Sequence, residues 1–309
     1  HQGAFLLGEC SRQTGDLAGA VRHFSVAAEK HQGPLSGDAR FRLGYVLFSQ
    51  DKYAEAAASL SAFLADFPDH GSADQAKLFL GQAHLELKQY DEAVATLAPL
   101  VKRQPPNPDA VLWLARAYSR REKFADACAT IQGAVSRMPT NAPPSRELVF
   151  DLGNNLMSDQ KYAQAVQAFS TIVSGHPDWD QAPDVLRLRA VCLHRAEKLA
   201  KSLADCDAFL AKYAGHASID ELAFLKAENQ FFLDMHDAAL ASYTQFIGAY
   251  PKSANRDATR LRIAQLQYRK KAWQEVLKQT KELADQDRSA PFYKQVSFLA
   301  GDSQYNLEQ

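Results

Sequence analysis

The chain has 309 residues, and its 35 lysines and arginines nearly balance 36 aspartates and glutamates, giving a formal net charge of −1. This balance offers no overall attraction to nucleic acid or a membrane surface, and the sequence has no apolar run of about 18 residues that could span a bilayer. The four cysteines (Cys10, Cys128, Cys192 and Cys206) lack CxxC spacing, so we interpret them as buried thiols rather than a disulfide framework.

A small residue recurs at a nearly constant interval along the chain. We assign it position 8 of a repeat; the members are Gly8, Gly44, Gly81, Ala115, Gly153, Ala190, Ala227, Ala264 and Gly301, which by subtraction lie 34 to 38 residues apart. Such a period predicts a stacked array of helical repeats. In chain order we expect repeats at about 1–36, 37–73, 74–107, 108–145, 146–182, 183–219, 220–256 and 257–291, and a partial ninth repeat at 292–309.

Each repeat has the pattern of an antiparallel helix pair. In the third repeat, Gly81 and Leu85 belong to one helical apolar stripe, and Ala93 and Leu97 belong to a second. The polar pair at 88–89 lies between the stripes and predicts a short turn. Proline at position 32 of five repeats ends the second helix, and an acidic residue then opens the next first helix, where it suits the helix dipole.

Two further positions mark the second helix of every repeat. Position 17 is usually large, and we expect it to cover the open end of the pair; its members are Leu17, Tyr53, Tyr90, Phe124, Tyr162, Leu199, His236 and Trp273. Position 20 is usually alanine, and we expect positions 8 and 20 to be small so that the two helices can approach closely. Two repeats depart from this pattern, the sixth with Ser202 and Cys206 and the eighth with Val276 and Thr280. The sequence leaves open whether the helix pairs of these two repeats are more loosely packed.

These patterns resemble tetratricopeptide repeats, most clearly in "GDLAGAVRHFSVA" (15–27), "QYDEAVATL" (89–97) and "KYAQAVQAFSTIV" (161–173). The resemblance covers essentially the whole chain. It implies an all-α, right-handed α-solenoid, or superhelix, of about eight helix-turn-helix repeats plus a partial ninth. Neither end has a complete polar capping repeat, which favours a fragment of a longer protein.

The longer repeats, such as "FLADFPDHGSADQAKLFLG", are more specifically similar to those of bacterial envelope proteins. Those families include the TolA-binding cell-division coordinator and the outer-membrane-assembly lipoprotein. This closer similarity implies a bacterial scaffold of the periplasm or cell envelope, with the cytoplasm as the alternative.

The resemblance also implies a ligand groove on the concave face, lined by the first helices. Carried over residue by residue, its candidates are Arg42, Tyr45, Phe79, Trp113, Arg116, Arg120, Asn154, Arg187, Arg195, Phe231, Arg262, Tyr268 and Arg269. Arginines and rings suit a peptide with carboxylates and apolar anchors; the alternative is that the rings pack between neighbouring first helices. The carboxylate clamp of chaperone-binding members is not evident, because Asn154 matches it but Phe150 stands where lysine is expected.

The sequence lacks the common phosphate-loop, serine-hydrolase and zinc-protease motifs, and we predict no catalytic residue, metal or cofactor. Cys192, His194 and Cys206 share a repeat, but we interpret them as two packed thiols and one exposed imidazole. We therefore predict a non-enzymatic protein–protein interaction scaffold for a peptide or partner domain, an acidic one in particular. The alternative is a recruiting arm of a larger enzyme; nucleic-acid binding and membrane insertion are disfavoured, and the oligomeric state is not predicted.

Overall fold

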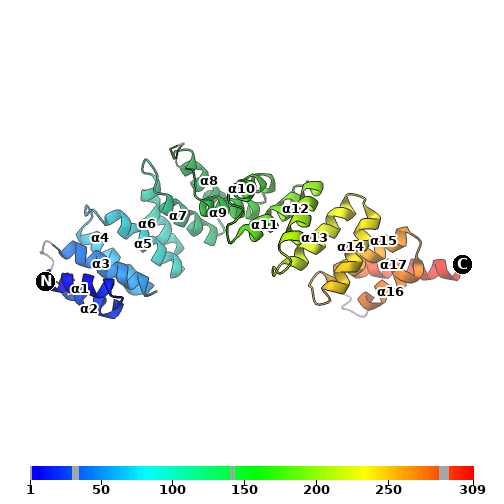
Figure 1. Cartoon of the computed structure of the whole chain (residues 1–309), viewed down its shortest axis with the longest axis horizontal. Helices are drawn as coiled ribbons and strands as arrows, with labels where there is room; N and C mark the ends of the chain where they lie inside the picture. The colour runs from blue at the N-terminus through cyan, green and yellow to red at the C-terminus, as the bar shows by residue number, and fades with distance from the viewer. Residues whose placement is uncertain (1, 30–34, 140, 142, 285–291) are drawn as a thin grey trace. The chain divides into compact units, whose positions relative to one another are not determined.

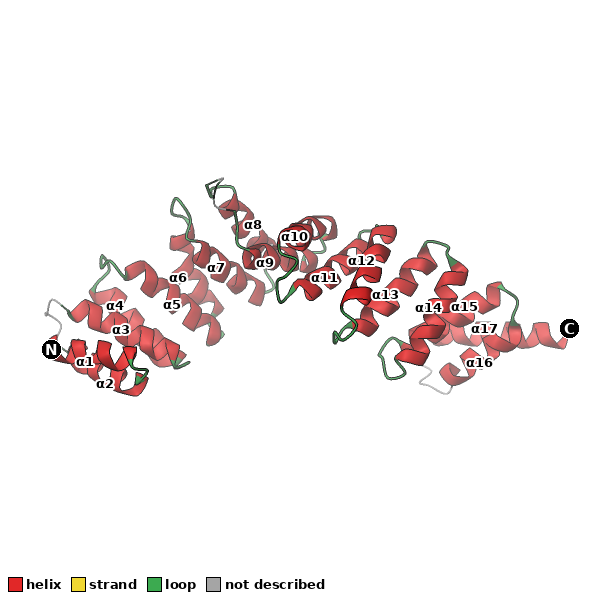
Figure 2. Ribbon diagram, viewed as in Figure 1, coloured by secondary structure: helices red, strands yellow, loops and turns green. Residues whose placement is uncertain are grey.

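The protein is built from helices alone over its described length. The computed structural model describes residues 2–29, 35–139, 141, 143–284 and 292–309, and within these it contains 17 α-helices and no strand (Figures 1 and 2). This confirms the predicted all-α repeat fold. The helices form two compact units, residues 1–160 and 161–309. Among the described residues, no helix is long and apolar enough to cross a membrane.

The described residues of the N-terminal unit form nine helices, and the odd-numbered ones are the first helices of the repeats. Consecutive helices pack on one another, and successive first helices also touch. The helices are α1 (Gln2–Gln13), α2 (Leu17–Ala28), α3 (Ser36–Ser49), α4 (Tyr53–Asp66), α5 (Ala73–Glu86), α6 (Tyr90–Val101), α7 (Pro108–Arg120), α8 (Phe124–Val135) and α9 (Arg146–Ser158).

The C-terminal unit begins with a second helix and then follows the same alternation. Its helices are α10 (Tyr162–Gly175), α11 (Ala182–Arg195), α12 (Leu199–Lys212), α13 (Ile219–Phe232), α14 (His236–Ala249), α15 (Arg256–Arg269), α16 (Trp273–Ala284) and α17 (Tyr293–Glu308). Every second helix begins at a position-17 residue, and the predicted acidic residues lie in the first turns of α3, α5, α7, α9, α11, α13 and α15.

The turn inside each repeat has one backbone conformation. At the end of α5, Lys88 has a φ of 60°, and the N–H of Gln89 donates to the carbonyl of His84 at 2.8 Å. This is the Schellman arrangement that ends helices with a left-handed residue. The left-handed residues are Gly15, Asp51, Lys88, Glu122, Gln160, Glu197, Asp234 and Lys271. Glycine is therefore replaced by polar residues at seven of these turns, and at five of the seven the next residue is polar as well.

The small residue at position 8 lies beneath a large side chain of the second helix. A Cβ added to Gly81 would lie 2.4 Å from Cγ of Leu97, and one added to Gly8 would lie 2.7 Å from the ring of Phe24. The nearest atoms belong to position 24, so the close partner of position 8 is this large residue rather than the small position 20 that we expected. Gly301 on α17 is exposed, with nothing within 4 Å of an added Cβ.

Position 20 is fully buried in every repeat that has a second helix. Ser202 keeps this burial because its hydroxyl donates to the carbonyl of Ala190 at 2.8 Å and accepts from Nδ2 of Asn229 at 2.8 Å. Thr280 of the eighth repeat donates to the carbonyl of Val276 at 2.9 Å. Neither hydroxyl is left unpaired, so hydrogen bonds take the place of apolar packing in both pairs.

Two predictions about cysteine and histidine exposure are corrected. Cys10 is exposed, whereas the other three thiols are buried, and burial raises the pKa of Cys192 to about 11 and that of Cys206 to about 12. His194 is half-buried rather than exposed. Its Nδ1 lies 2.8 Å from Oδ1 of Asn229, because the next first helix, α13, packs over it.

Candidate ligand groove

Charged side chains connect neighbouring first helices at repeated positions. In each case position 9 of one repeat meets position 6 of the next. The pairs are Arg42 with Glu9 (3.0 Å), Arg116 with Asp151 (2.7 Å) and Arg262 with Glu228 (2.7 Å). Three arginines that the sequence predicts as ligand contacts are thus held by acids 33 to 35 residues away, and their first role is to fix the register of adjacent repeats.

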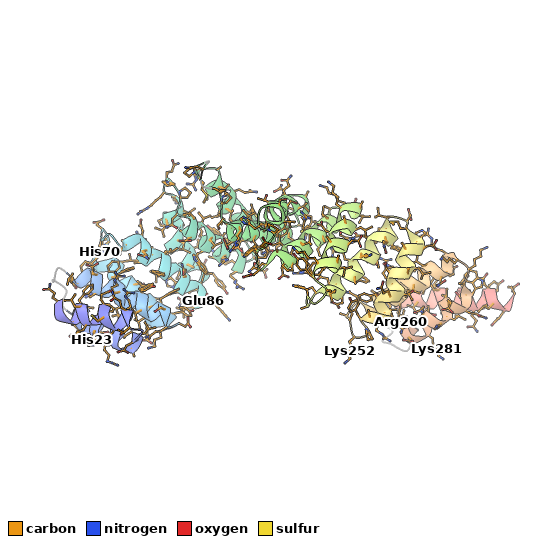
Figure 3. All side chains as sticks on the ribbon, viewed as in Figure 1. His23, His70, Glu86, Lys252, Arg260 and Lys281 are labelled. Carbon is orange, nitrogen blue, oxygen red and sulfur yellow. The ribbon has the colours of Figure 1, made fainter. Side chains whose placement is uncertain are left out.

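A pocket of about 720 Å³ lies in the N-terminal unit, at the C-terminal ends of α5, α7 and α9. We call it the Trp113 pocket; its lining is Leu85, Glu86, Lys88, Tyr90, Trp113, Arg116, Ser119, Arg120, Phe124, Asp151, Asn154, Asn155 and Ser158. The last residues of the three first helices, Glu86, Arg120 and Ser158, all line it. Figure 3 shows Glu86 at the edge of this unit opposite His70. Of the thirteen candidate groove residues, the pocket brings together Trp113, Arg116, Arg120 and Asn154.

One side of the pocket is a fixed cation–ring assembly. The guanidinium carbon of Arg116 lies 4.8 Å from the centre of the Trp113 ring, and its Nε donates to Oδ2 of Asp151 at 2.7 Å. Burial raises the pKa of the Asp151 carboxyl, and Arg116 opposes this rise. The side chain of Asp151 is only 15% exposed, and Arg116 neutralises its charge. Arg116 therefore positions the Trp113 ring and is not free to bind a ligand.

Two other polar groups of the pocket have no partner among the residues that the structure describes. Arg120 is exposed and Asn154 is half-buried, and neither forms a hydrogen bond or ion pair with another described residue. The adjacent Asn155 differs, since its Nδ2 donates to the carbonyl of Asp151 at 2.7 Å and its Oδ1 accepts from Ser119 at 2.6 Å. The pocket therefore presents a guanidinium and a carboxamide beside an indole ring, which can hold a carboxylate and a peptide group.

The remaining candidates of the N-terminal unit pack between helices. Tyr45 of α3 and Phe79 of α5 have ring centres 5.1 Å apart, and Phe48 lies 5.3 Å from Phe79. Arg42 is paired with Glu9 and lies against a ring of its own helix. These positions match the packing alternative, which assigns the rings to contacts between first helices.

In the C-terminal unit, most candidates are also engaged. Arg187 of α11 reaches Glu221 of α13 at 3.1 Å, and the hydroxyl of Tyr268 donates to Asp302 at 2.6 Å. Arg269 donates to Nε2 of His236 at 2.8 Å. These contacts connect neighbouring helices of the unit, as the ion pairs do in the N-terminal unit.

The Arg262 side chain connects α15 to α13. Its two nitrogens bind both oxygens of Glu228, at 2.7 and 2.9 Å, and its guanidinium carbon lies 4.4 Å from the ring centre of Phe231. The buried Tyr243 donates to the same carboxylate, and burial followed by the charge of Glu228 raises the pKa of Tyr243. In contrast, Arg195 is exposed and has no described polar partner.

Sequence reasoning placed both the arginines and their acidic partners at groove positions but did not predict that they pair. Glu9, Asp151 and Glu228 occupy the groove positions too, yet nothing within one repeat indicates that they pair with an arginine. The signal lies in two repeats read together, as opposite charges at position 9 and at position 6 of the next repeat. No group of three or more His, Cys, Asp or Glu residues in the described part could hold a metal ion.

Three family models, each described as Tetratricopeptide repeat, match the chain. One matches residues 11–71, 78–144 and 150–217, the second matches 47–106, and the third matches 221–253. The first alone covers more than half of the sequence. No curated protein matches the chain.

Solved structures of other repeat proteins are similar in fold. The C-terminal part of a repeat protein from Cytophaga hutchinsonii has a TM-score of 0.61 at 15% identity, over 83% of this chain and 98% of that one. A tetratricopeptide repeat protein from Parabacteroides merdae has a TM-score of 0.55 at 15% identity, over 86% and 97%. MamA of Desulfovibrio magneticus has a TM-score of 0.50 at 20% identity, over 58% and 96%. At these identities the likeness concerns the fold alone.

Proposed function

Because the chain belongs to the tetratricopeptide repeat family, we propose that it is a non-enzymatic scaffold that binds a peptide or partner domain in the Trp113 pocket. The repeat fold supports a protein-interaction role in general. The observation that carries the specific proposal is a pair of unpartnered donors, Arg120 and Asn154, in a pocket of about 720 Å³. That volume lies within the range of about 300–1,000 Å³ typical of ligand sites.

The chemistry of the pocket favours a peptide over an apolar ligand. A guanidinium can bind both oxygens of a carboxylate, and the carboxamide of Asn154 can donate to and accept from one peptide group at once. Trp113 adds a large rigid surface of the kind that dominates binding energies. Glu86 and Lys88 also line the pocket, so its lining carries both signs of charge. We therefore expect a peptide that places one acidic residue at Arg120 but is not acidic along its whole length.

The fixed ion pair of the pocket decides which variants are informative. Truncating Arg116 would leave Asp151 unpaired and largely buried, which is costly in itself, so lost binding would not report on the ligand. Arg120→Gln and Asn154→Ser remove a guanidinium and a carboxamide that no other described residue uses. The matched control is Arg22→Gln on α2, an exposed arginine of a second helix with no described partner.

The test is titration of each variant with a labelled pool of synthetic acidic peptides, followed by fluorescence anisotropy. We expect the Arg120→Gln and Asn154→Ser proteins to bind the pool several-fold more weakly, while Arg22→Gln binds like the parent and far-UV circular dichroism is unchanged in all three. Equal binding by all variants would refute the assignment of the site to this pocket.

We further propose a bacterial envelope location, supported by the similarity of the longer repeats to those of envelope proteins. Fractionation of the host cell tests it. Recovery of the protein with cytosolic markers would refute the location and leave the proposed scaffold role untouched.

A further inference from the structure

A smaller pocket, of about 300 Å³, lies in the C-terminal unit and is lined by residues of the second helices α12 and α14 and of the first helix α13. We call it the Ala223 pocket; its lining includes Leu210, Ala223, Lys226, Ser242, Gln245 and Tyr250. None of the thirteen candidate groove residues lines it. It is therefore distinct from the predicted groove and from the Trp113 pocket.

The second repeat places an arginine where this pocket lies in the seventh repeat. Its position 4 is Arg40, whose guanidinium binds Asp66 and whose guanidinium carbon lies 5.7 Å from the ring centre of Phe67. Asp66 and Phe67 are positions 30 and 31 of their repeat. In the seventh repeat these positions are Ala249 and Tyr250, and both line the pocket.

The eighth repeat also has an arginine at position 4. Arg260 donates to Oε1 of Gln279 at 3.2 Å and forms an ion pair with Glu282. These two partners are positions 23 and 26 of their repeat. In the seventh repeat the same positions are Ser242 and Gln245, which again line the pocket.

The seventh repeat has lost both the arginine and its acid. Its position 4 is Ala223, so the pocket occupies the space that an arginine fills in two other repeats. The acids at positions 30 and 26 are replaced by Ala249 and Gln245, and no acidic residue lines the pocket. A cationic ligand would have no carboxylate partner in this lining, and burying an unpaired charge is costly.

The polar groups of the lining also favour an uncharged ligand. Nζ of Lys226 lies 2.7 Å from Oδ1 of Asp207 on α12, so its charge is already compensated. Ser242 and Gln245 form no hydrogen bond with another described residue. A hydroxyl and a carboxamide can each donate and accept, so these two groups suit a neutral partner of either kind.

We propose that the Ala223 pocket binds an uncharged aromatic ring that carries one N–H or O–H group, of the indole or phenol type. The ring takes the space of the planar guanidinium and packs against Tyr250, whose own ring centre lies 5.3 Å from that of the buried Phe246. Its N–H or O–H group bonds with Gln245 or Ser242.

The size of the pocket suits one small ring system. Its volume of about 300 Å³ is at the lower end of the range typical of ligand pockets. The ring can belong to a free small molecule or to a tryptophan or tyrosine side chain of a partner protein. This inference goes beyond the proposed scaffold function and does not depend on it.

The test is titration of the protein, labelled with carbon-13 at its alanine methyl groups, followed by proton–carbon correlation spectra. Indole represents a free small molecule, and N-acetyltryptophanamide represents a side chain. We expect indole to shift the signals of Ala223 and Ala249 saturably and to leave that of Ala93, buried in the N-terminal unit, in place. Benzamidine, an aromatic cation, should bind about five-fold more weakly or worse.

Two variants fill the pocket with side chains that other repeats carry at the same positions. Ala223→Leu copies Leu186 of the sixth repeat, and Ala223→Arg combined with Gln245→Glu copies the pair of the eighth repeat. Both should keep the parent far-UV circular dichroism and weaken indole binding about ten-fold or more, as followed at Ala249. The matched control is Ala241→Leu, at an exposed position of α14 outside the pocket, which should bind like the parent.

The outcomes are distinct for this pocket and for the Trp113 pocket. If indole produces no saturable shift at Ala223 or Ala249, or if both filled variants bind it like the parent, the proposal is wrong. Binding of indole alone supports a free small molecule as the ligand, and binding of both probes supports a side chain. The filled variants should bind the acidic peptide pool like the parent, so either proposal can fail without the other.

Discussion

Replacing Gly81 with alanine tests the packing that defines the repeat. The new Cβ would lie 2.4 Å from Cγ of Leu97, so the Leu97 side chain or one of the two helices must shift. Overpacking of this kind costs about 1–3 kcal/mol, whereas alanine in a helix interior returns up to about 1 kcal/mol relative to glycine. We expect Gly81→Ala to be destabilising by about 1–2 kcal/mol.

The matched control is Gly133→Ala on α8, because this glycine is also helical but an added Cβ meets nothing within 4 Å. At this position only the higher helix propensity of alanine applies, and we expect the substitution to stabilise the fold by up to about 1 kcal/mol. Native-state amide hydrogen exchange is the suitable assay, since repeat arrays can open locally and α5 and α6 must be followed separately.

A second substitution tests the cause of the loss. The fourth repeat has alanine at position 8, and there position 24 is Ile131 instead of leucine. Isoleucine has one δ carbon where leucine has two, and both δ carbons of Leu97 lie within 2.9 Å of the added Cβ. The double variant Gly81→Ala with Leu97→Ile should therefore cost less than the sum of the two single changes, by about 0.5 kcal/mol or more. Additive losses, or a Gly81→Ala protein as stable as Gly133→Ala, would refute this account of the helix contact.

Three other predictions follow from the turns, the polar network and the thiols. Glu122→Gly should stabilise the fold by about 0.5–1 kcal/mol in thermal unfolding, because glycine adopts a left-handed backbone without the penalty that other residues carry; a lower melting temperature would contradict this. Asn229→Ala should destabilise α11–α14 by about 1–3 kcal/mol in hydrogen exchange, since Ser202 and His194 lose their partner; unchanged exchange there would contradict the network. Titration with a thiol reagent at pH 8 should find one fast thiol, Cys10, in the native protein and four after denaturation, and a second fast native thiol would contradict the burial.

Much of the fold could be predicted from the sequence because the same packing requirement, a small residue at position 8, recurs in every repeat. Position 8 lies against position 24 of the second helix, so it must be small wherever that residue is large, as at Gly81 beneath Leu97. The turns were predicted from polar pairs such as residues 88–89. Their left-handed backbone was not predicted, because Lys88 and most of its equivalents are not glycine. Backbone conformation at such positions is set by the hydrogen bonds of the helix end, which composition does not reveal.

The candidate site was harder to predict because its chemistry depends on contacts between repeats. The sequence identifies Arg116 and Arg120 as equally promising, since both face the groove. Only the structure distinguishes them, because Asp151 of the next first helix holds Arg116, whereas Arg120 has no partner in the described part of the chain. Ser202 is a similar case, since its partner Asn229 comes from the following repeat. Residues about 35 apart must be read together to find such pairs.

The most direct test of the central claim is the indole N–H signal of Trp113 in a proton–nitrogen correlation spectrum during titration with the acidic peptide pool. The chain has two other tryptophans, Trp179 and Trp273, neither of which lines the pocket. If the unpartnered donors of the Trp113 pocket bind the peptide, the Trp113 signal shifts while the other two stay in place. Binding that leaves the Trp113 signal unmoved would contradict the account.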